Sequence, residues 1–209
     1  EIVENGINLE KMKSNIDFKK KYAINCDYFL FLGRFHKVKG IDMLLKAMHL
    51  IKNHHLMSDV KLVIMGVDFG YEEEMLQLIG QYNLQDKIKV IKNPSRKEVI
   101  SAYNESEFLV LPSRWELSPL TPLEGFAFKK PVISSNVHGI PYTVTHNVNG
   151  ILVEPENHNE LANAITELLT DKNKRLAYGN AGYHLVDSIC NSTIMSKETL
   201  KVYEKTISR

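Results

Sequence analysis

The stretch that matters most for the fold is Tyr28-Phe29-Leu30-Phe31-Leu32-Gly33. Its apolar residues are continuous, which is typical of a strand buried on both faces of a parallel sheet, and the glycine ends the run. Between residues 41 and 51 apolar side chains recur every three or four positions, which predicts a helix with one buried face. A buried strand that leads into such a helix is the repeating unit of an α/β sheet.

The same alternation continues along the chain. We expect strands at residues 60–65, 88–91, 108–111, 132–134 and 151–153, and helices at residues 72–82, 97–103, 123–128, 159–169, 174–186 and 193–207. Strands separated by helices imply right-handed crossovers and a mainly parallel, doubly wound, Rossmann-like sheet. We assign residues 25–190 to this domain, residues 1–24 to a linker and lead-in, and residues 191–209 to a C-terminal helix.

Length and composition fit one domain in a reducing compartment. The chain has 209 residues and a formal net charge of +1, so no overall field recruits nucleic acid or an anionic membrane. It has two cysteines far apart in sequence and no apolar run near the ~18 residues of a membrane span, which favours a cytoplasmic location. The eight histidines show no metal-binding spacing, so we expect no metal.

In an open parallel sheet, ligands bind beyond the carboxyl ends of the strands. The first such loop contains Gly33, Arg34 and Lys39. The glycine permits close backbone approach, and the two cations lie just before a helix whose free amides and dipole favour an anion. This combination suits a phosphate, although a solvated basic loop is an alternative interpretation of the same residues.

Two further loops are less specific. Gly66 follows the second strand, and a strand-to-helix turn explains it without a ligand. Lys92, Asn93 and Pro94 follow the third strand, where their backbone groups can meet a nucleobase. Ser95 is expected to cap the next helix, which is the simpler explanation of that loop.

The loop at residues 112–127 is the most informative. A helix that begins near Thr121 points its free amides toward the crevice, with Glu124 one turn inside it and Glu116 on the loop before it. Ionised carboxylates are strong acceptors for sugar and ribose hydroxyls. Glu124 is also explained as a first-turn acid favoured by the helix dipole, but Glu116 is not. We expect Trp115 and Phe126 to be core residues.

Taken together, these segments resemble the group 1 retaining glycosyltransferases, a family with two Rossmann-like domains that face each other (the GT-B fold). The resemblance covers nearly the whole chain and is most specific at Glu116 and Glu124, which seven residues separate as in the family's paired-glutamate motif. The matching segments are residues 3–8, similar to the family's interdomain linker, the Gly33-Arg34 and Lys39-Gly40 pairs, and residues 130–133 and 149–153. The chain is thereby identified as the C-terminal, donor-binding half of such an enzyme.

The resemblance implies roles for individual residues. Arg34 and Lys39 would neutralise the donor's diphosphate, Glu116 would lie close to the transferred sugar, and these three would be catalytic. Glu124 would accept hydrogen bonds from the ribose. The implied donor site comprises Gly33, Arg34, Lys39, Lys92, Asn93, Pro94, Glu116, Ser118, Leu120, Thr121 and Glu124, with backbone amides near Leu120 and Thr121 on the phosphates.

The resemblance also implies substrates and limits. The donor would be a UDP-, GDP- or ADP-sugar, with no further cofactor, and a hexosyl group would pass to an acceptor glycan or a lipid-linked acceptor. We expect the family's first domain to be missing from these residues, together with the acceptor site and any peripheral membrane contact, so the isolated chain would be inactive. Pro119 and Tyr142 depart from the residues that many members carry, Gly and Glu. A nucleotide-sugar epimerase, a glycan phosphorylase of related fold and a non-catalytic binding or regulatory domain are the alternatives.

Overall fold

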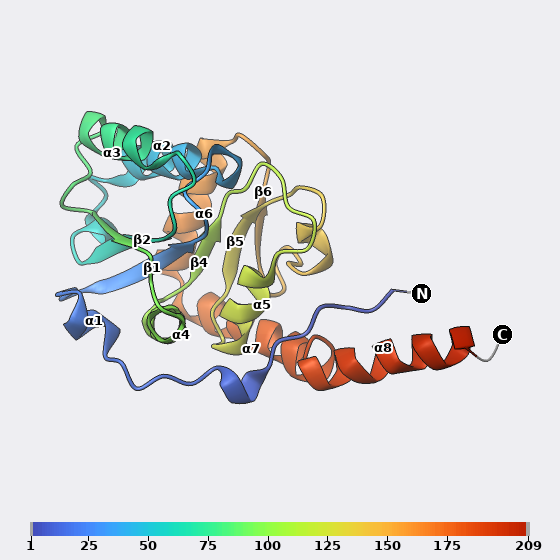
Figure 1. Ribbon diagram of the computed structural model, residues 1–209. Coiled ribbons are helices and arrows are strands. Elements are labelled where there is room, and N and C mark those ends of the chain that lie inside the picture. The colour runs from blue at the N-terminus through green and yellow to red at the C-terminus, as the bar shows by residue number, and fades with distance from the viewer. Residues whose placement is uncertain (1, 208–209) are drawn as a thin grey trace.

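The computed structural model of the protein describes residues 2–207 and contains one parallel sheet of six strands (Figure 1). The strand order is β3-β2-β1-β4-β5-β6, so β2 and β3 extend the sheet on one side of β1, and β4, β5 and β6 extend it on the other. The strands are β1 (Asp27–Leu32), β2 (Val60–Gly66), β3 (Ile88–Lys92), β4 (Leu109–Leu111), β5 (Val132–Ser135) and β6 (Gly150–Val153). The doubly wound α/β prediction is confirmed.

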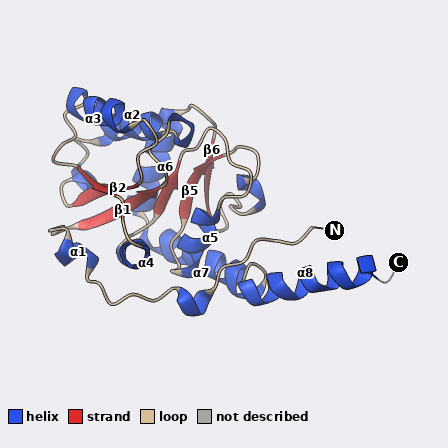
Figure 2. Ribbon diagram, in the orientation of Figure 1, coloured by secondary structure: helices blue, strands red, loops and turns tan. Residues whose placement is uncertain are grey.

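Helices cover both faces of the sheet (Figure 2). The helices are α1 (Phe18–Lys21), α2 (Ile41–Ile51), α3 (Glu72–Gln81), α4 (Arg96–Glu105), α5 (Leu120–Ala127), α6 (His158–Thr170), α7 (Lys172–Ser188) and α8 (Ser192–Ile207), with short 3-10 turns η1 (Leu9–Lys11), η2 (Lys37–Lys39), η3 (His55–Met57) and η4 (Ile140–Tyr142). Side chains of α2, α3 and α6 share one buried cluster, and those of α4 and α5 share the other. All the predicted helices are present within the described residues.

The residues of β1 alternate between the two clusters. Phe29 and Phe31 pack with α2, α3 and α6, whereas Tyr28 and Leu30 pack with α4 and α5. All four side chains are fully buried. This explains the continuous apolar run, because a strand with helices on both faces has no side left for polar residues. Each fully buried side chain of this size contributes about 1.5–3 kcal/mol relative to an exposed one.

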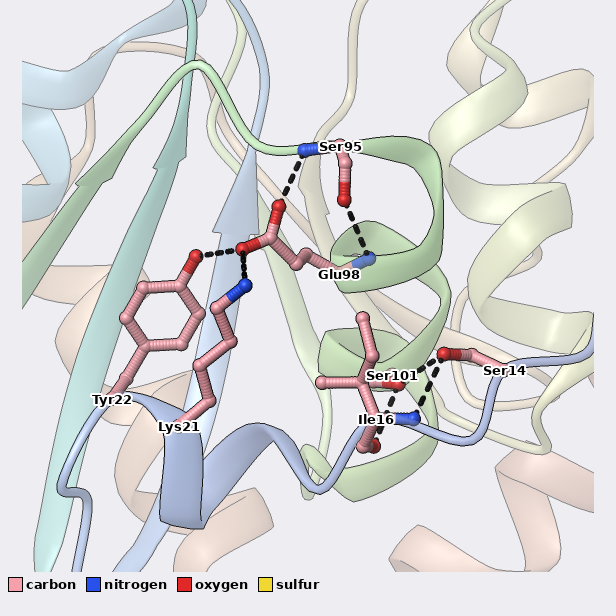
Figure 3. Close-up of polar contacts among 7 residues, drawn as sticks. All are labelled: Ser14, Ile16, Lys21, Tyr22, Ser95, Glu98 and Ser101. Atoms are coloured by element: carbon pink, nitrogen blue, oxygen red, sulfur yellow. Dashed lines mark hydrogen bonds and ion pairs between the residues drawn. The ribbon is translucent and has the colours of Figure 1, made fainter.

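The lead-in packs along α4 on one side of the domain (Figure 3). Lys21 forms an ion pair with Glu98 at 2.7 Å, and the Tyr22 hydroxyl donates a hydrogen bond to the same carboxylate. Glu98 also accepts a hydrogen bond from the Ser95 backbone at 2.7 Å, while Ser95 caps α4, which confirms its predicted role. The Lys21 ammonium, then the Ser95 and Tyr22 donors, lower the pKa of Glu98 to about 2.

The N-terminal segment pairs with the turn between α7 and α8. Ile7 donates a backbone hydrogen bond to Cys190 at 2.8 Å and accepts one from Ser192 at 3.0 Å. Helix α8 then extends away from the sheet, next to the N-terminal segment (Figure 1), and none of its described side chains is buried. Within residues 2–207 no helix combines the length and apolar character needed to cross a bilayer. The predicted boundaries at residues 1 and 209 lie outside the described residues.

Candidate functional site

The strand order creates a crevice between the carboxyl ends of β1 and β4. β1 lies between β2 and β4. After β2 the chain continues to β3 on one side of the sheet, and after β4 it continues to β5 and β6 on the other side. Such a switch point is where open α/β sheets bind their ligands. The loop after β1, residues 33–40, and the loop after β4, residues 112–119, both begin there, and they carry the most informative sequence motifs.

These two loops run side by side in close contact. Gly40 adopts a left-handed conformation with φ of 68°, and a Cβ atom there would lie 1.9 Å from the carbonyl oxygen of Pro112. Only glycine tolerates both the conformation and the approach. Farther along, the backbone N–H of Arg114 donates to the carbonyl of Val38 at 2.8 Å. The cation-bearing loop and the acid-bearing loop are therefore packed as one unit.

Lys39 and Glu116 meet where the loops touch. The Lys39 ammonium lies 2.5 Å from Oε1 of Glu116, and the Ser113 hydroxyl donates to the same oxygen at 2.9 Å. Their side chains are 14% and 12% exposed, respectively, so the pair is shielded from water without being sealed off. Removing either partner would leave the other charge partly buried and uncompensated, which is costly. The predicted proximity of these two residues is present in the structure.

The N-terminus of α5 faces the same edge of the sheet. The residue before the helix is Pro119, no side chain caps the helix, and Pro122 carries no N–H. The first amides of a helix have no intrahelical acceptor, so the N–H groups of Leu120 and Thr121 are available to an external acceptor. Together with the helix dipole they favour an anion.

The backbone of Glu116 is fixed from the other side by the loop after β5. The Gly139 N–H donates to the carbonyl of Glu116 at 3.0 Å. A Cβ atom at Gly139 would lie 1.5 Å from the carbonyl oxygen of Leu117. A larger residue at Gly139 would therefore force the acid loop to move.

Glu124 is held by partners of its own on α4. Its Oε1 forms an ion pair with Arg96 at 2.6 Å, and its Oε2 accepts a hydrogen bond from the Tyr103 hydroxyl at 2.7 Å. Burial, and then the Glu124 charge, raise the pKa of Tyr103 well above its usual value, so this hydroxyl remains a donor. Arg96 and Tyr103 were not predicted from the sequence, although their spacing of seven places them on one face of α4.

Arg34 departs from the predicted cluster of charges. Its guanidinium lies over the exposed ring of Phe69, 5.1 Å from the ring centre, on the side of the neighbouring β2 loop. This loop continues the pairing of β1 with β2, because Phe35 donates to the Val67 carbonyl at 2.7 Å. The structure thus pairs Lys39, but not Arg34, with Glu116.

Three further predicted donor-site residues, Lys92, Asn93 and Pro94, follow β3 at the same edge of the sheet. The Lys92 ammonium lies 2.8 Å from Glu72, and this hydrogen bond raises the pKa of Lys92. Asn93 has a positive φ of 50° and donates its N–H to the Gly66 carbonyl at 2.8 Å. Pro94 directly precedes the Ser95 cap. These residues lie at the carboxyl end of β3, as expected.

The two other predicted residues have structural contacts. The Ser118 hydroxyl accepts a hydrogen bond from Asn5 of the lead-in at 2.7 Å, which ties that segment to the acid loop. A Cβ atom at Gly66 would lie only 1.8 Å from the carbonyl oxygen of Gly33. This close approach confirms the structural role expected of Gly66.

Arg114 is a third residue that was not predicted from the sequence. Its guanidinium makes two parallel bonds to Asp42, at 2.7 and 2.8 Å, and an ion pair with Glu156 at 2.5 Å. It also donates to the carbonyl of Lys37 at 2.6 Å. Although burial alone would raise the pKa of Asp42, the hydrogen bonds from Arg114 hold it below its usual value. Arg114 lies two residues before Glu116, and its network joins the loop after β1, the loop after β4 and the loop after β6.

The expectation that Trp115 belongs to the core is wrong. Its side chain is 48% exposed and contacts only the ring of His138 among the aromatic groups of the described residues, at 6.0 Å between ring centres. The neighbours on either side, Arg114 and Glu116, both point inward to ionic partners, so the side chain between them points outward. Phe126 is fully buried, as expected.

Comparison with known proteins identifies the family. The model of "Glycosyl transferases group 1" matches residues 13–185. An uncharacterized glycosyltransferase of Methanocaldococcus jannaschii is 31% identical over 182 residues, which is 87% of this chain and 47% of that protein. The chain spans about half the length of the relatives it matches.

Solved structures show the same fold. Sucrose-phosphate synthase from Thermosynechococcus elongatus superposes with a TM-score of 0.85 at 27% identity, over 100% of this chain and 53% of that one. Anabaena HepE, solved in complex with UDP and glucose, superposes with a TM-score of 0.85 at 19% identity, over 98% of this chain and 56% of that one. The family model covers most of the chain, and the chain therefore belongs to the group 1 glycosyltransferases and has the Rossmann-like architecture of their GT-B fold.

Proposed function

We propose that this chain is the donor-binding half of a retaining glycosyltransferase that takes its sugar from a nucleoside diphosphate. The observation that carries the proposal is the Lys39–Glu116 pair, which lies at the switch point between β1 and β4. A cation, a carboxylate and free helix amides at one sheet edge are the groups that a sugar diphosphate needs.

The proposed chemistry is electrostatic. When the bond between sugar and diphosphate breaks, negative charge grows on the leaving nucleoside diphosphate. Lys39, Arg34 and the amides of Leu120 and Thr121 would stabilise this charge from fixed positions, which lowers the barrier more than mobile solvent can. Lys39 pairs with Glu116, and Arg34, which lies over the ring of Phe69, would have to leave that ring to join it.

The carboxylates are proposed to bind hydroxyl groups. Glu116 would hold the transferred sugar, and Glu124 the ribose. Each Glu124 oxygen makes one contact with α4, through Arg96 or Tyr103. An ionised carboxylate has about four acceptor sites, so capacity remains for a ribose hydroxyl. Backbone groups at residues 92–94 are proposed to contact the nucleobase, with Gly33 and Ser118 completing the site.

The complete protein is proposed to transfer a hexosyl group, with retained configuration, to a glycan or lipid-linked acceptor. The acceptor site, and any peripheral contact with a membrane, would lie in a first domain that this chain does not span, with α8 packing against that domain. The chain alone would then bind donor weakly and transfer nothing, since half of the surrounding cleft would be absent. We place the reaction in the cytoplasm, where UDP-, GDP- or ADP-sugars would be the donors, without another cofactor.

Incubation of the complete protein with radiolabelled nucleotide sugars and candidate acceptors tests this proposal. We expect one donor to yield a labelled glycan whose anomeric configuration, read by NMR, matches that of the donor. Glu116→Ala should lower kcat by about 100-fold or more. Inverted configuration would refute retention, conversion of the donor without any acceptor would indicate an epimerase, and full activity of Glu116→Ala would refute the assigned site.

A further inference from the structure

Arg114 combines more contacts than a single surface ion pair provides. Its Nη1 donates to the Lys37 carbonyl and to Oδ1 of Asp42, and its Nη2 lies within hydrogen-bond distance of Oδ2 of Asp42 and of Glu156. Its Nε lies 2.5 Å from the other oxygen of Glu156. A guanidinium has five N–H donors, and each has an acceptor here. No other side chain offers this planar set of donors.

The partners of Arg114 come from two separate parts of the chain, residues 37–42 and Glu156. Lys37 lies on the loop that carries Lys39, Asp42 lies in the first turn of α2, and Glu156 lies on the loop between β6 and α6. Arg114 itself lies on the acid loop, two residues before Glu116. The side chains of Arg114 and Asp42 are only 25% and 14% exposed, so solvent screens this pair less than an open surface pair.

These contacts determine how the two loops are placed relative to each other. The backbone bond from Arg114 to Val38 fixes their spacing at one point, and the side chain fixes it again at Lys37. Lys39 and Glu116 lie directly beyond these two points and depend on the same spacing for their 2.5 Å contact. Loss of the Arg114 contacts would therefore increase the distance between the Lys39 ammonium and the Glu116 carboxylate.

We propose that Arg114 is a positioning residue, which holds Lys39 and Glu116 in the geometry required for sugar transfer without touching the donor. The inference rests on the proposed function. It predicts a specific defect: misplacement by about 1 Å of a group that acts in the transition state can cost 100-fold in rate. The defect should appear mainly in kcat, because Arg114 makes no contact with substrate.

The test compares Arg114→Lys with a matched control, Arg175→Lys, in the complete protein. Arg175 is 15% exposed, donates to the carbonyls of Leu168 and Leu169 and pairs with Glu107 at 3.0 Å, before the start of β4 and therefore at the opposite end of the sheet. Arg114→Lys should lower kcat by about 10–100-fold with less than a threefold rise in the donor's KM. Arg175→Lys should leave both values within about twofold of those of the wild type.

A second readout needs no transfer activity. Trp115 is the only tryptophan of the chain and lies between Arg114 and Glu116. In the chain itself, time-resolved fluorescence anisotropy should show a larger fast component in Arg114→Lys than in the wild type or Arg175→Lys, because the loop has lost its anchor. Equal anisotropy in all three proteins would overturn the proposal, as would unchanged kcat in Arg114→Lys or an equal loss of kcat in both variants.

The outcomes also separate this inference from the proposed function. If Lys39→Ala transfers sugar as well as the wild type, or the wild type transfers none, the proposed function fails whatever the anisotropy shows. If the wild type transfers sugar, Lys39→Ala does not, and Arg114→Lys is normal in both assays, only the positioning role is refuted.

Discussion

Replacing Gly40 with alanine is the sharpest test of how the two loops are packed. The residue has φ of 68°, and its new Cβ atom would lie 1.9 Å from the carbonyl oxygen of Pro112 and 2.8 Å from the carbonyl carbon. The left-handed conformation costs a non-glycine residue about 1–2 kcal/mol. The overlap with a backbone atom adds about 1–3 kcal/mol, because Pro112 or the start of α2 must shift.

Gly70 provides a matched control for the first of these two costs. It also has a positive φ, 83°, but a Cβ atom there meets nothing within 4 Å. Gly70→Ala should therefore lose about 1–2 kcal/mol, and Gly40→Ala about 2–5 kcal/mol. Any entropic gain from restricting the unfolded chain applies to both variants and cancels in the comparison.

Thermal unfolding followed by circular dichroism measures the difference. At this chain length 1 kcal/mol corresponds to about 2–4 °C, so the Tm of Gly40→Ala should lie about 2–12 °C below that of Gly70→Ala. Affinity for nucleoside diphosphates should also fall only in Gly40→Ala, since Lys39 is the adjacent residue. Equal Tm values for the two variants would show that the loops are not packed as described.

Two further predictions concern stability. Glu98→Ala should lower the free energy of unfolding by about 1–3 kcal/mol at pH 7, because Lys21 and Ser95 lose their acceptor. The folded pKa of Glu98, about 2, lies below the usual value of 4.5, so the contribution of Glu98 to stability is complete above pH 4.5 and declines toward pH 2. Urea titrations at pH 7 and 3.5 should show a smaller deficit at the lower pH, and an unchanged deficit would contradict the assignment. In the same assay Phe126→Ala should lower the free energy of unfolding by about 3–5 kcal/mol, whereas Trp115→Ala should change it by no more than about 0.5 kcal/mol. Similar losses in the two variants would refute the exposed position of Trp115.

Much of the fold could be predicted because each element carries a local signal. The continuous run at Tyr28 to Leu32 predicts a strand covered on both faces, and β1 contributes to both core clusters. The Ser95 cap and the turn role of Gly66 could also be predicted, since each depends on residues close in sequence or on one backbone position. The prediction that Trp115 is buried was wrong, because the residue type does not say in which direction a loop side chain points.

The pairing of side chains across loops could be predicted only in part. The spacing of Glu116 from Glu124, and of Lys39 from β1, places all three at the same edge of the sheet, but it does not say which cation meets which acid. In the structure Lys39 forms an ion pair with Glu116, and Arg96 forms one with Glu124. Arg114 and its partners are distant in sequence, and no local pattern connects them.

The central claim is that Lys39 binds the diphosphate of the donor. Isothermal titration of UDP, GDP and ADP into the chain, its Lys39→Ala variant and a control tests this claim most directly. Lys174→Ala is the control, because Lys174 also forms an ion pair, with Glu167 at 2.6 Å, away from the site. We predict that at least one of these ligands binds the wild type and the control equally and binds Lys39→Ala about 10-fold or more weakly, as expected for a lost charge-assisted hydrogen bond. Equal affinity in all three proteins, or no binding of any ligand to the wild type, would contradict the account.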